Sequence, residues 1–180
     1  MDVVLRPMRR DDLGLLGRWL REPLVATWWH DDPDPAAMER QYGPALDGRD
    51  PAVLRIGEVD GRPVGFVQWF QFADEPGYRA ELAPFVEVPM DAWSLDYLIG
   101  DAADRRRGVG SALVRAAVAA IGPDPIVVPV HADNAASAAV LRHAGFSVVA
   151  EADLEPDNPA HSRAHLVLLR PALSGGPPVA

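Results

Sequence analysis

The chain has 180 residues, of which 48% are hydrophobic and 24% charged, and this length and composition are typical of a single soluble globular domain. The formal net charge of −9 argues against a nucleic-acid partner, because phosphate binding needs a basic surface, but it permits a cationic small-molecule substrate. Cysteine is absent, so we expect neither disulfides nor cysteine nucleophiles. No apolar run reaches membrane-spanning length and the N-terminus is not a signal peptide, so we expect a cytoplasmic protein without a membrane partner.

In the first half of the chain the patterns predict a strand, two helices and a hairpin. Pro23 ends the first of these helices, and Asp34 followed by Pro35 marks the start of the second. The prolines of 75–91 predict mostly loop there, with at most a short extended piece at 85–88. The expected strands are 3–6, 52–59 and 62–72, and the expected helices run from 11 or 12 to about 21 and from 35 to about 46.

In the second half of the chain strands and helices alternate. The expected strands are 92–100, 126–130, 146–150 and 164–169, and the expected helices are 108–122 and 135–144. This order predicts an α+β fold, or α/β with a mixed sheet flanked by helices. Residues 1–173 are expected to form the one domain, and the Gly/Pro-rich segment 174–180 a disordered tail.

A glycine motif links the strand 92–100 to the helix that follows it. A helix that starts at such a turn offers free N–H groups and the positive end of its dipole, which suits a pyrophosphate held without a metal. A Walker A loop is excluded because no lysine follows Gly110, and a dinucleotide fingerprint is excluded because Leu113 replaces its third glycine. The motif consists of Arg105, Arg106, Arg107, Gly108, Val109, Gly110 and Ser111.

Its R-x-x-G-x-G pattern resembles the coenzyme A loop of the GNAT acyltransferases, and Asn134 to Phe146 resembles their second signature. The resemblance implies the GNAT fold, with a mixed and mostly antiparallel sheet, and acetyl-CoA as the cofactor. It places the pyrophosphate against residues 105–111. It also implies that the backbone groups of Leu98, Ile99 and Gly100 pair with the pantetheine amides. Asn134 either touches the pantetheine or only caps its helix.

Four stretches, 25–29, 60–68, 94–100 and 156–159, resemble the aminoglycoside 6'-N-acetyltransferase branch of that family. This resemblance implies a resistance enzyme that acetylates an aminoglycoside amine by direct attack in a ternary complex. Related acceptors stay open: a siderophore hydroxylysine, a kasugamycin-type amino sugar or a peptide N-terminus. So does a non-catalytic coenzyme A-binding module. Monomer and homodimer are both compatible with the sequence.

The resemblance assigns roles to five residues. Asp96 would be the catalytic group that orients the amine and takes its proton, and an aspartate inside a strand is uncommon enough to ask for a reason. Trp28 and Trp29, expected in a loop between helices, would line the acceptor cleft or fill the core, one of each. Tyr97 and Asp157 complete the substrate-binding set.

Acidic residues are dense around the expected cleft, where Arg79 is the only basic residue from 71 to 96, and this balance suits a polycationic acceptor. They are Asp74, Glu75, Glu81, Glu87, Asp91, Asp96, Asp153, Glu155 and Asp157. The histidines lack usual ligand spacing, so we expect no metal. Leu141 departs from the family, since many members have there a tyrosine that protonates the departing thiolate. Either another group such as Tyr97 does so, or water does.

Overall fold

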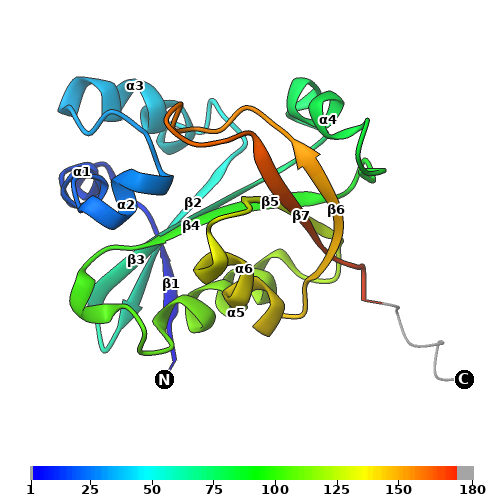
Figure 1. Ribbon diagram of the computed structural model, residues 1–180. Helices are drawn as coiled ribbons and strands as arrows, with labels where there is room; N and C mark the ends of the chain where they lie inside the picture. Colours follow the sequence, from blue (N-terminus) through cyan, green and yellow to red (C-terminus); the bar gives the residue numbers. More distant parts are fainter. Residues whose placement is uncertain (1, 174–180) are drawn as a thin grey trace, which may run out of the picture.

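The computed structural model describes residues 2–173, and the predicted disordered tail lies outside them. A single seven-stranded sheet runs through the molecule in the order β1-β2-β3-β4-β5-β7-β6 (Figure 1). Among the strands of residues 2–173, β4 and β5 are the only parallel neighbours, so the predicted mixed, mostly antiparallel sheet of an α+β fold is confirmed. The strands are β1 (Val4–Pro7), β2 (Val53–Val59), β3 (Arg62–Gln71), β4 (Trp93–Ile99), β5 (Ile126–His131), β6 (Ser147–Asp153) and β7 (Ala164–Arg170).

Helices cover both faces of the sheet (Figure 1). Helices α1 to α3 pack against one face through a buried cluster that includes Trp19, Phe66 and Leu98. Helices α5 and α6 pack against the other face through a cluster that includes Leu95, Leu113 and Leu141. The helices are α1 (Leu13–Leu20), α2 (Pro23–Trp28), α3 (Pro35–Leu46), α4 (Pro76–Leu82), α5 (Val109–Ile121) and α6 (Ala135–His143), with short 3-10 turns η1 (Arg10–Asp12) and η2 (Ala102–Asp104).

Two local predictions were wrong. Pro23 does follow α1, but it also occupies the first turn of α2, so Trp28 is helical rather than part of a loop. The segment predicted as mostly loop contains α4, which again begins with a proline. Its residues Tyr78 and Leu82 pack against Phe72 in a third cluster, and this tertiary burial stabilises a helix that its own composition does not favour. In the described residues, no helix combines the length and apolarity needed to cross a membrane.

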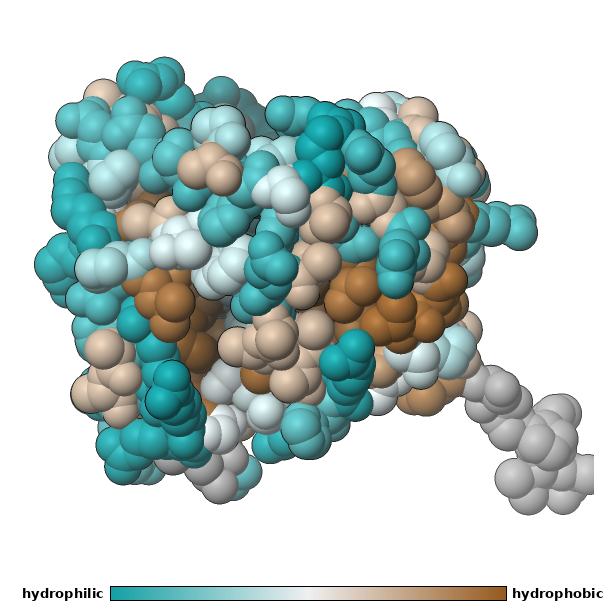
Figure 2. Space-filling model, in the orientation of Figure 1, coloured by the Kyte–Doolittle hydropathy of each residue, from teal (hydrophilic) through white to brown (hydrophobic). Residues whose placement is uncertain are grey.

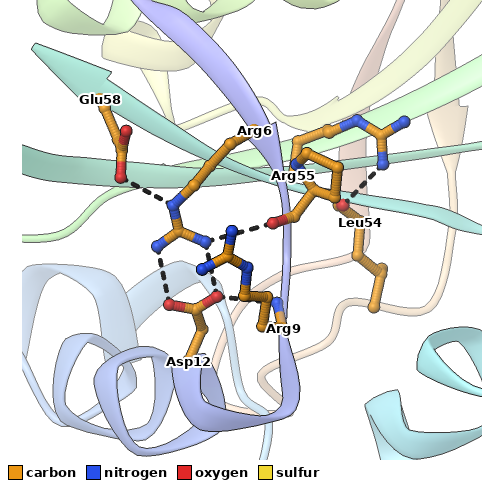
Figure 3. A network of polar contacts seen from close by, with 7 residues as sticks. Arg6, Arg9, Asp12, Leu54, Arg55 and Glu58 are labelled. Atoms are coloured by element: carbon orange, nitrogen blue, oxygen red, sulfur yellow. Dashed lines mark hydrogen bonds and ion pairs between the residues drawn. The ribbon is translucent and has the colours of Figure 1, made fainter. Parts of the chain in front are cut away.

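Arg6 of the edge strand β1 links the sheet to the segment that leads into α1 (Figure 3). Arg6 of β1 donates to Glu58 of β2 at 2.7 Å and, with two nitrogens, to Asp12 at 2.7 and 2.8 Å. The sequence allows Asp11 or Asp12 as the cap of the first helix; Asp12 is the residue that precedes α1, but its carboxylate accepts from the N–H of Arg9 and from Arg6 and not from the helix. The hydrogen bonds from Arg6 lower the pKa of Asp12. This network links β1 and β2 to η1, which directly precedes α1.

Candidate functional site

Strands β4 and β5 separate almost as soon as they meet. Within residues 2–173 their pairing is confined to Trp93 and Ile126, where the Trp93 N–H donates to the Pro125 carbonyl at 2.9 Å. β3 pairs with β4 along its whole length, so β4 has one satisfied edge and one open edge. The space-filling view is hollowed left of centre, with hydrophobic residues in its walls, close to where Figure 1 draws α6 (Figure 2). An extended ligand with amide groups could pair with such an edge as an added strand.

The direction of the peptide groups decides which residues can pair there. Gly100, which directly follows β4, donates its N–H to the carbonyl of Val64 in β3 at 3.0 Å. Since alternate residues of a strand direct their peptide groups to opposite sides, those of Leu98 face β3, whereas those of Tyr97 and Ile99 face the open edge. Three residues were predicted to pair with the pantetheine amides. Ile99 can do so, because its peptide groups face the open edge. The prediction was wrong for Leu98 and Gly100, because the peptide groups of Leu98 and the N–H of Gly100 face β3.

The predicted anion-binding turn lies between η2 and α5. Gly108 precedes the helix with φ 84°, and Arg106 also has a positive φ of 58°. The first N–H to bond inside the helix is that of Ala112, which donates to the Gly108 carbonyl at 3.0 Å. The N–H groups that come before it, those of Val109, Gly110 and Ser111, point out of the first turn, and in the part of the chain that the structure describes no side chain caps them. This arrangement suits a phosphate or pyrophosphate.

The arginines of the turn have different surroundings. Arg105 is directed back toward the strand, where it donates to the Gly100 carbonyl at 2.7 Å and lies 3.4 Å from a Glu22 oxygen. Arg106 and Arg107 are exposed and can add charge to an anion site. Just before them, Asp104 is buried and accepts two hydrogen bonds from Arg62, at 2.6 and 2.7 Å. These bonds lower the pKa of Asp104 and hold η2 against the β2–β3 hairpin.

Asp96 lies on the face of β4 that α1 to α3 cover. It is half-buried, and Gln68 on the adjacent strand donates to its carboxylate at 3.0 Å. Loss of hydration raises the pKa of Asp96 to about 6, the hydrogen bond from Gln68 opposes this rise, and the negative charges of Asp157 and Asp31 add to it. A carboxylate whose pKa lies close to neutrality can take up and release a proton near physiological pH.

Asp31 is a site residue that sequence reasoning missed. It follows α2, and it accepts hydrogen bonds from the indole N–H of Trp29 at 2.9 Å and from the Tyr42 hydroxyl at 2.5 Å. Its charge raises the pKa of Asp157 as well as that of Asp96, after the larger effect of burial on each. The only sequence signal was its place beside the tandem tryptophans. Together Asp31, Asp96 and Asp157 form what we call the acidic triad.

The β6–β7 loop carries Asp157 to this position because it is attached to α2. Trp28 stacks on His161 with ring centroids 4.7 Å apart, and the Thr27 carbonyl lies within hydrogen-bonding distance of the side chains of Asn158 (3.2 Å) and His161 (2.9 Å). Trp29, by contrast, packs on the buried ring of Phe66. Trp28 therefore holds the β6–β7 loop through its stacking on His161, and Trp29 holds Asp31 through the hydrogen bond from its indole N–H. Among residues 2–173 no group of three or more potential ligand side chains could hold a metal.

Two other acidic residues that the sequence placed near the cleft are engaged elsewhere. Arg163 forms ion pairs with both Asp153 and Glu155 on the surface. Surface pairs of this kind contribute little to stability, but they reduce the charge that these residues offer a ligand. Asp153 and Glu155 therefore do not belong to the acidic triad.

On the opposite face of β4, the Tyr97 hydroxyl lies 3.0 Å from the Ser137 hydroxyl in the first turn of α6. Asn134 caps that helix, because its side-chain oxygen accepts from the Ser137 N–H at 3.1 Å. Capping was one of the two roles expected for Asn134. Leu141, one turn further along, is completely buried. This face thus presents hydroxyl groups against the open edge of β4.

Comparison with known proteins agrees with this geometry. A family model described as an acetyltransferase (GNAT) domain matches residues 9–154. Two aminoglycoside N(6')-acetyltransferases of type 1, from Klebsiella pneumoniae and Serratia marcescens, are each 27% identical over an alignment of 148 residues that covers 75% of this chain and 67% of theirs. A crystal structure of an aminoglycoside acetyltransferase in complex with coenzyme A and kanamycin superposes with a TM-score of 0.77 at 22% identity, covering 94% of this chain and 95% of that one.

Proposed function

The chain belongs to the GNAT acetyltransferase family, and we propose that the amine it acetylates is carried by an aminoglycoside. It is an N-acetyltransferase, and acetyl-CoA is its acyl donor. The observation that carries the proposed acceptor is that Asp31 is held at the end of α2, the loop of Asp157 is attached to α2, and the charges of both residues act on Asp96 of β4. Three carboxylates whose charges influence one another favour an acceptor with several ammonium groups. The names of the relatives with 27% identity point to the same class of acceptor.

The residues present fit the coenzyme. The free N–H groups of 109–111 would receive its pyrophosphate, Arg106 and Arg107 would add charge, and the open peptide groups of Tyr97 and Ile99 would pair with the amide-containing arm. When bound, the coenzyme supplies an acetyl group activated as a thioester. The arm would then end beside Asp96, on the edge between the two helical layers.

We assign the catalytic role to Asp96. An ammonium group cannot attack a carbonyl, so the acceptor nitrogen must first lose a proton, and Asp96 is placed to take it directly or through one water. The neutral amine then attacks in a ternary complex without a covalent enzyme intermediate, in keeping with a chain that has no cysteine. Gln68 holds the carboxylate in place during this step. The cytoplasmic location and the oligomeric state stay predictions from the sequence.

The pH dependence of kcat/KM tests Asp96 as the base. Activity should rise as the pH increases through about 6, because only the ionised carboxylate accepts a proton. Gln68→Leu removes a hydrogen bond that favours the ionised form, so the rise should move to higher pH. Asp157→Asn removes a nearby negative charge, so the rise should move to lower pH. If both variants keep the wild-type midpoint, the rise belongs to another group.

A thiol-release assay with acetyl-CoA tests the acceptor. We expect turnover with aminoglycosides that carry a 6'-amino group, and little with the same scaffolds bearing a 6'-hydroxyl. Polyamines, hydroxylysine, kasugamycin and peptides with free N-termini are the comparison set. A clear preference for one of those would replace the aminoglycoside as acceptor. Tight coenzyme A binding with no turnover on any amine would instead support the alternative of a non-catalytic binding module.

A further inference from the structure

Asp96 and Tyr97 are adjacent in β4, so their side chains point to opposite faces of the sheet. Asp96 lies on the face covered by α1 to α3 and pairs with Gln68. Tyr97 lies on the other face, where it packs against the cluster that contains Leu113 of α5 and Leu141 of α6. The open edge of β4 lies between these two faces of the sheet. A carbonyl group held at that edge would have a carboxylate on one side and a hydroxyl on the other.

The Tyr97 hydroxyl is held rather than free. The Ser137 hydroxyl lies 3.0 Å from it, and Ser137 belongs to the capped first turn of α6. Ser137 can accept the phenolic proton or donate its own, so Tyr97 can turn its O–H toward a negative charge while Ser137 donates to the phenol oxygen. The start of a helix also favours negative charge nearby. Leu141, the residue one turn further on this helix, has no polar group to contribute.

We propose that Tyr97, positioned by Ser137, donates a hydrogen bond to the sulfur that leaves when the acetyl group is transferred. This inference rests on the proposed function of the site. As the carbon–nitrogen bond forms, the carbon–sulfur bond breaks and its electron pair stays on sulfur, beside the Tyr97 O–H. Two protons leave the ammonium nitrogen, the first to Asp96 and the second to solvent. Asp96 returns its proton to solvent, solvent protonates the sulfur, and one proton is released per turnover.

The pKa of the Tyr97 hydroxyl decides whether Tyr97 only donates a hydrogen bond to the sulfur or transfers its proton to it. Burial raises the pKa of Tyr97 to about 12, and the contact with Ser137 opposes that rise. An ordinary thiol has a pKa of about 8.5, so moving the phenolic proton onto the thiolate would run uphill by roughly three pKa units. Tyr97 therefore stays protonated and acts as a donor that stabilises charge, in the manner of an oxyanion hole.

The decisive experiment titrates the thiol of enzyme-bound coenzyme A by the ultraviolet absorbance of its thiolate. If Tyr97 donates to sulfur, the bound thiol should have a pKa about one unit lower in the wild type than in Tyr97→Phe, a tenfold difference in thiolate population at a given pH. Ser137→Ala should fall between them. Tyr42→Phe is the matched control, because its hydroxyl binds Asp31 on the other face, and it should leave this pKa unchanged.

Kinetics give the second readout. Tyr97→Phe should lower kcat about tenfold while the KM for acetyl-CoA stays within about twofold, because the lost bond forms only as charge develops on sulfur. Equal thiol pKa values in the wild type and Tyr97→Phe would overturn the proposal. The titration needs no acceptor, so an enzyme that prefers another amine would refute the aminoglycoside and leave this test intact. Failure of the wild type to bind coenzyme A would overturn both.

Discussion

Replacing Asp96 with asparagine should lower kcat by about a hundredfold or more, the usual contribution of a positioned general base. Asparagine has nearly the same shape and its side-chain oxygen can still accept from Gln68, so the fold should be preserved. It cannot take a proton from the acceptor, which would remain an ammonium. The dissociation constant of coenzyme A, measured by calorimetry, should change less than about twofold, because the groups proposed to hold it lie in 97–99 and 105–111.

The control for this variant is Asp11→Asn, which removes the same charge from an exposed position in η1. It should keep wild-type kcat and acceptor KM. The pH profile adds a check, since the residual activity of Asp96→Asn should no longer rise through about pH 6. An Asp96→Asn enzyme with wild-type kcat would remove Asp96 from the mechanism and require another base.

Gly100→Ala should be among the most damaging single substitutions in this chain. A Cβ at this position would stand 2.1 Å from the indole nitrogen of Trp19 and 2.2 Å from a ring carbon. Trp19 is only 2% exposed and packs in the cluster below α1, so its ring has no room to move away. Overpacking of this kind costs about 2–3 kcal/mol or more, which should lower the melting temperature by roughly 5–10 °C.

Gly100→Ala should also weaken coenzyme binding. The Gly100 carbonyl accepts from Arg105, at the start of the turn proposed to hold the pyrophosphate, and displacing the end of β4 would move that turn. We expect the KM for acetyl-CoA to rise several-fold at a temperature where the variant is folded. Gly14→Ala is the matched control: its Cβ would meet no atom within 4 Å, and at the second residue of α1 it should leave the melting temperature unchanged or raise it slightly, because alanine favours a helix more than glycine does. A fully stable Gly100→Ala protein would show that Trp19 can move.

Features encoded by neighbouring residues could be predicted from the sequence. The turn at 105–111 needs a glycine with positive φ before an apolar helix, and Gly108 provides it with φ 84°. The helix after Asn134 needs a cap and a terminator, and Asn134 and Gly145 provide them. These choices depend on backbone sterics over a few residues, so they remain readable in the chain.

The acidic triad could be predicted only in part. Asp96 and Asp157 were identified through resemblance, but Asp31 was not, because its importance comes from contacts with Trp29, Tyr42 and the charges of two distant elements. Likewise, α4 was missed because its stability comes from burial against Phe72 and not from helix propensity. Contacts between residues far apart in the chain cannot be recognised from the spacing of hydrophobic residues along the sequence.

The sequence by itself determined the order of the seven strands and of helices α1, α3, α5 and α6, the glycine turn at 105–111, the absence of cysteine chemistry and the negative net charge. Each of these follows from local conformational preference or from composition. Only the tertiary structure decided that β4 and β5 part after one residue pair, that the peptide groups of Tyr97 and Ile99 face the resulting edge, and that Asp96 and Tyr97 flank it from opposite faces. The pairing of strands that are far apart in the sequence depends on how the whole sheet packs between the two helical layers, and no short stretch of residues specifies it.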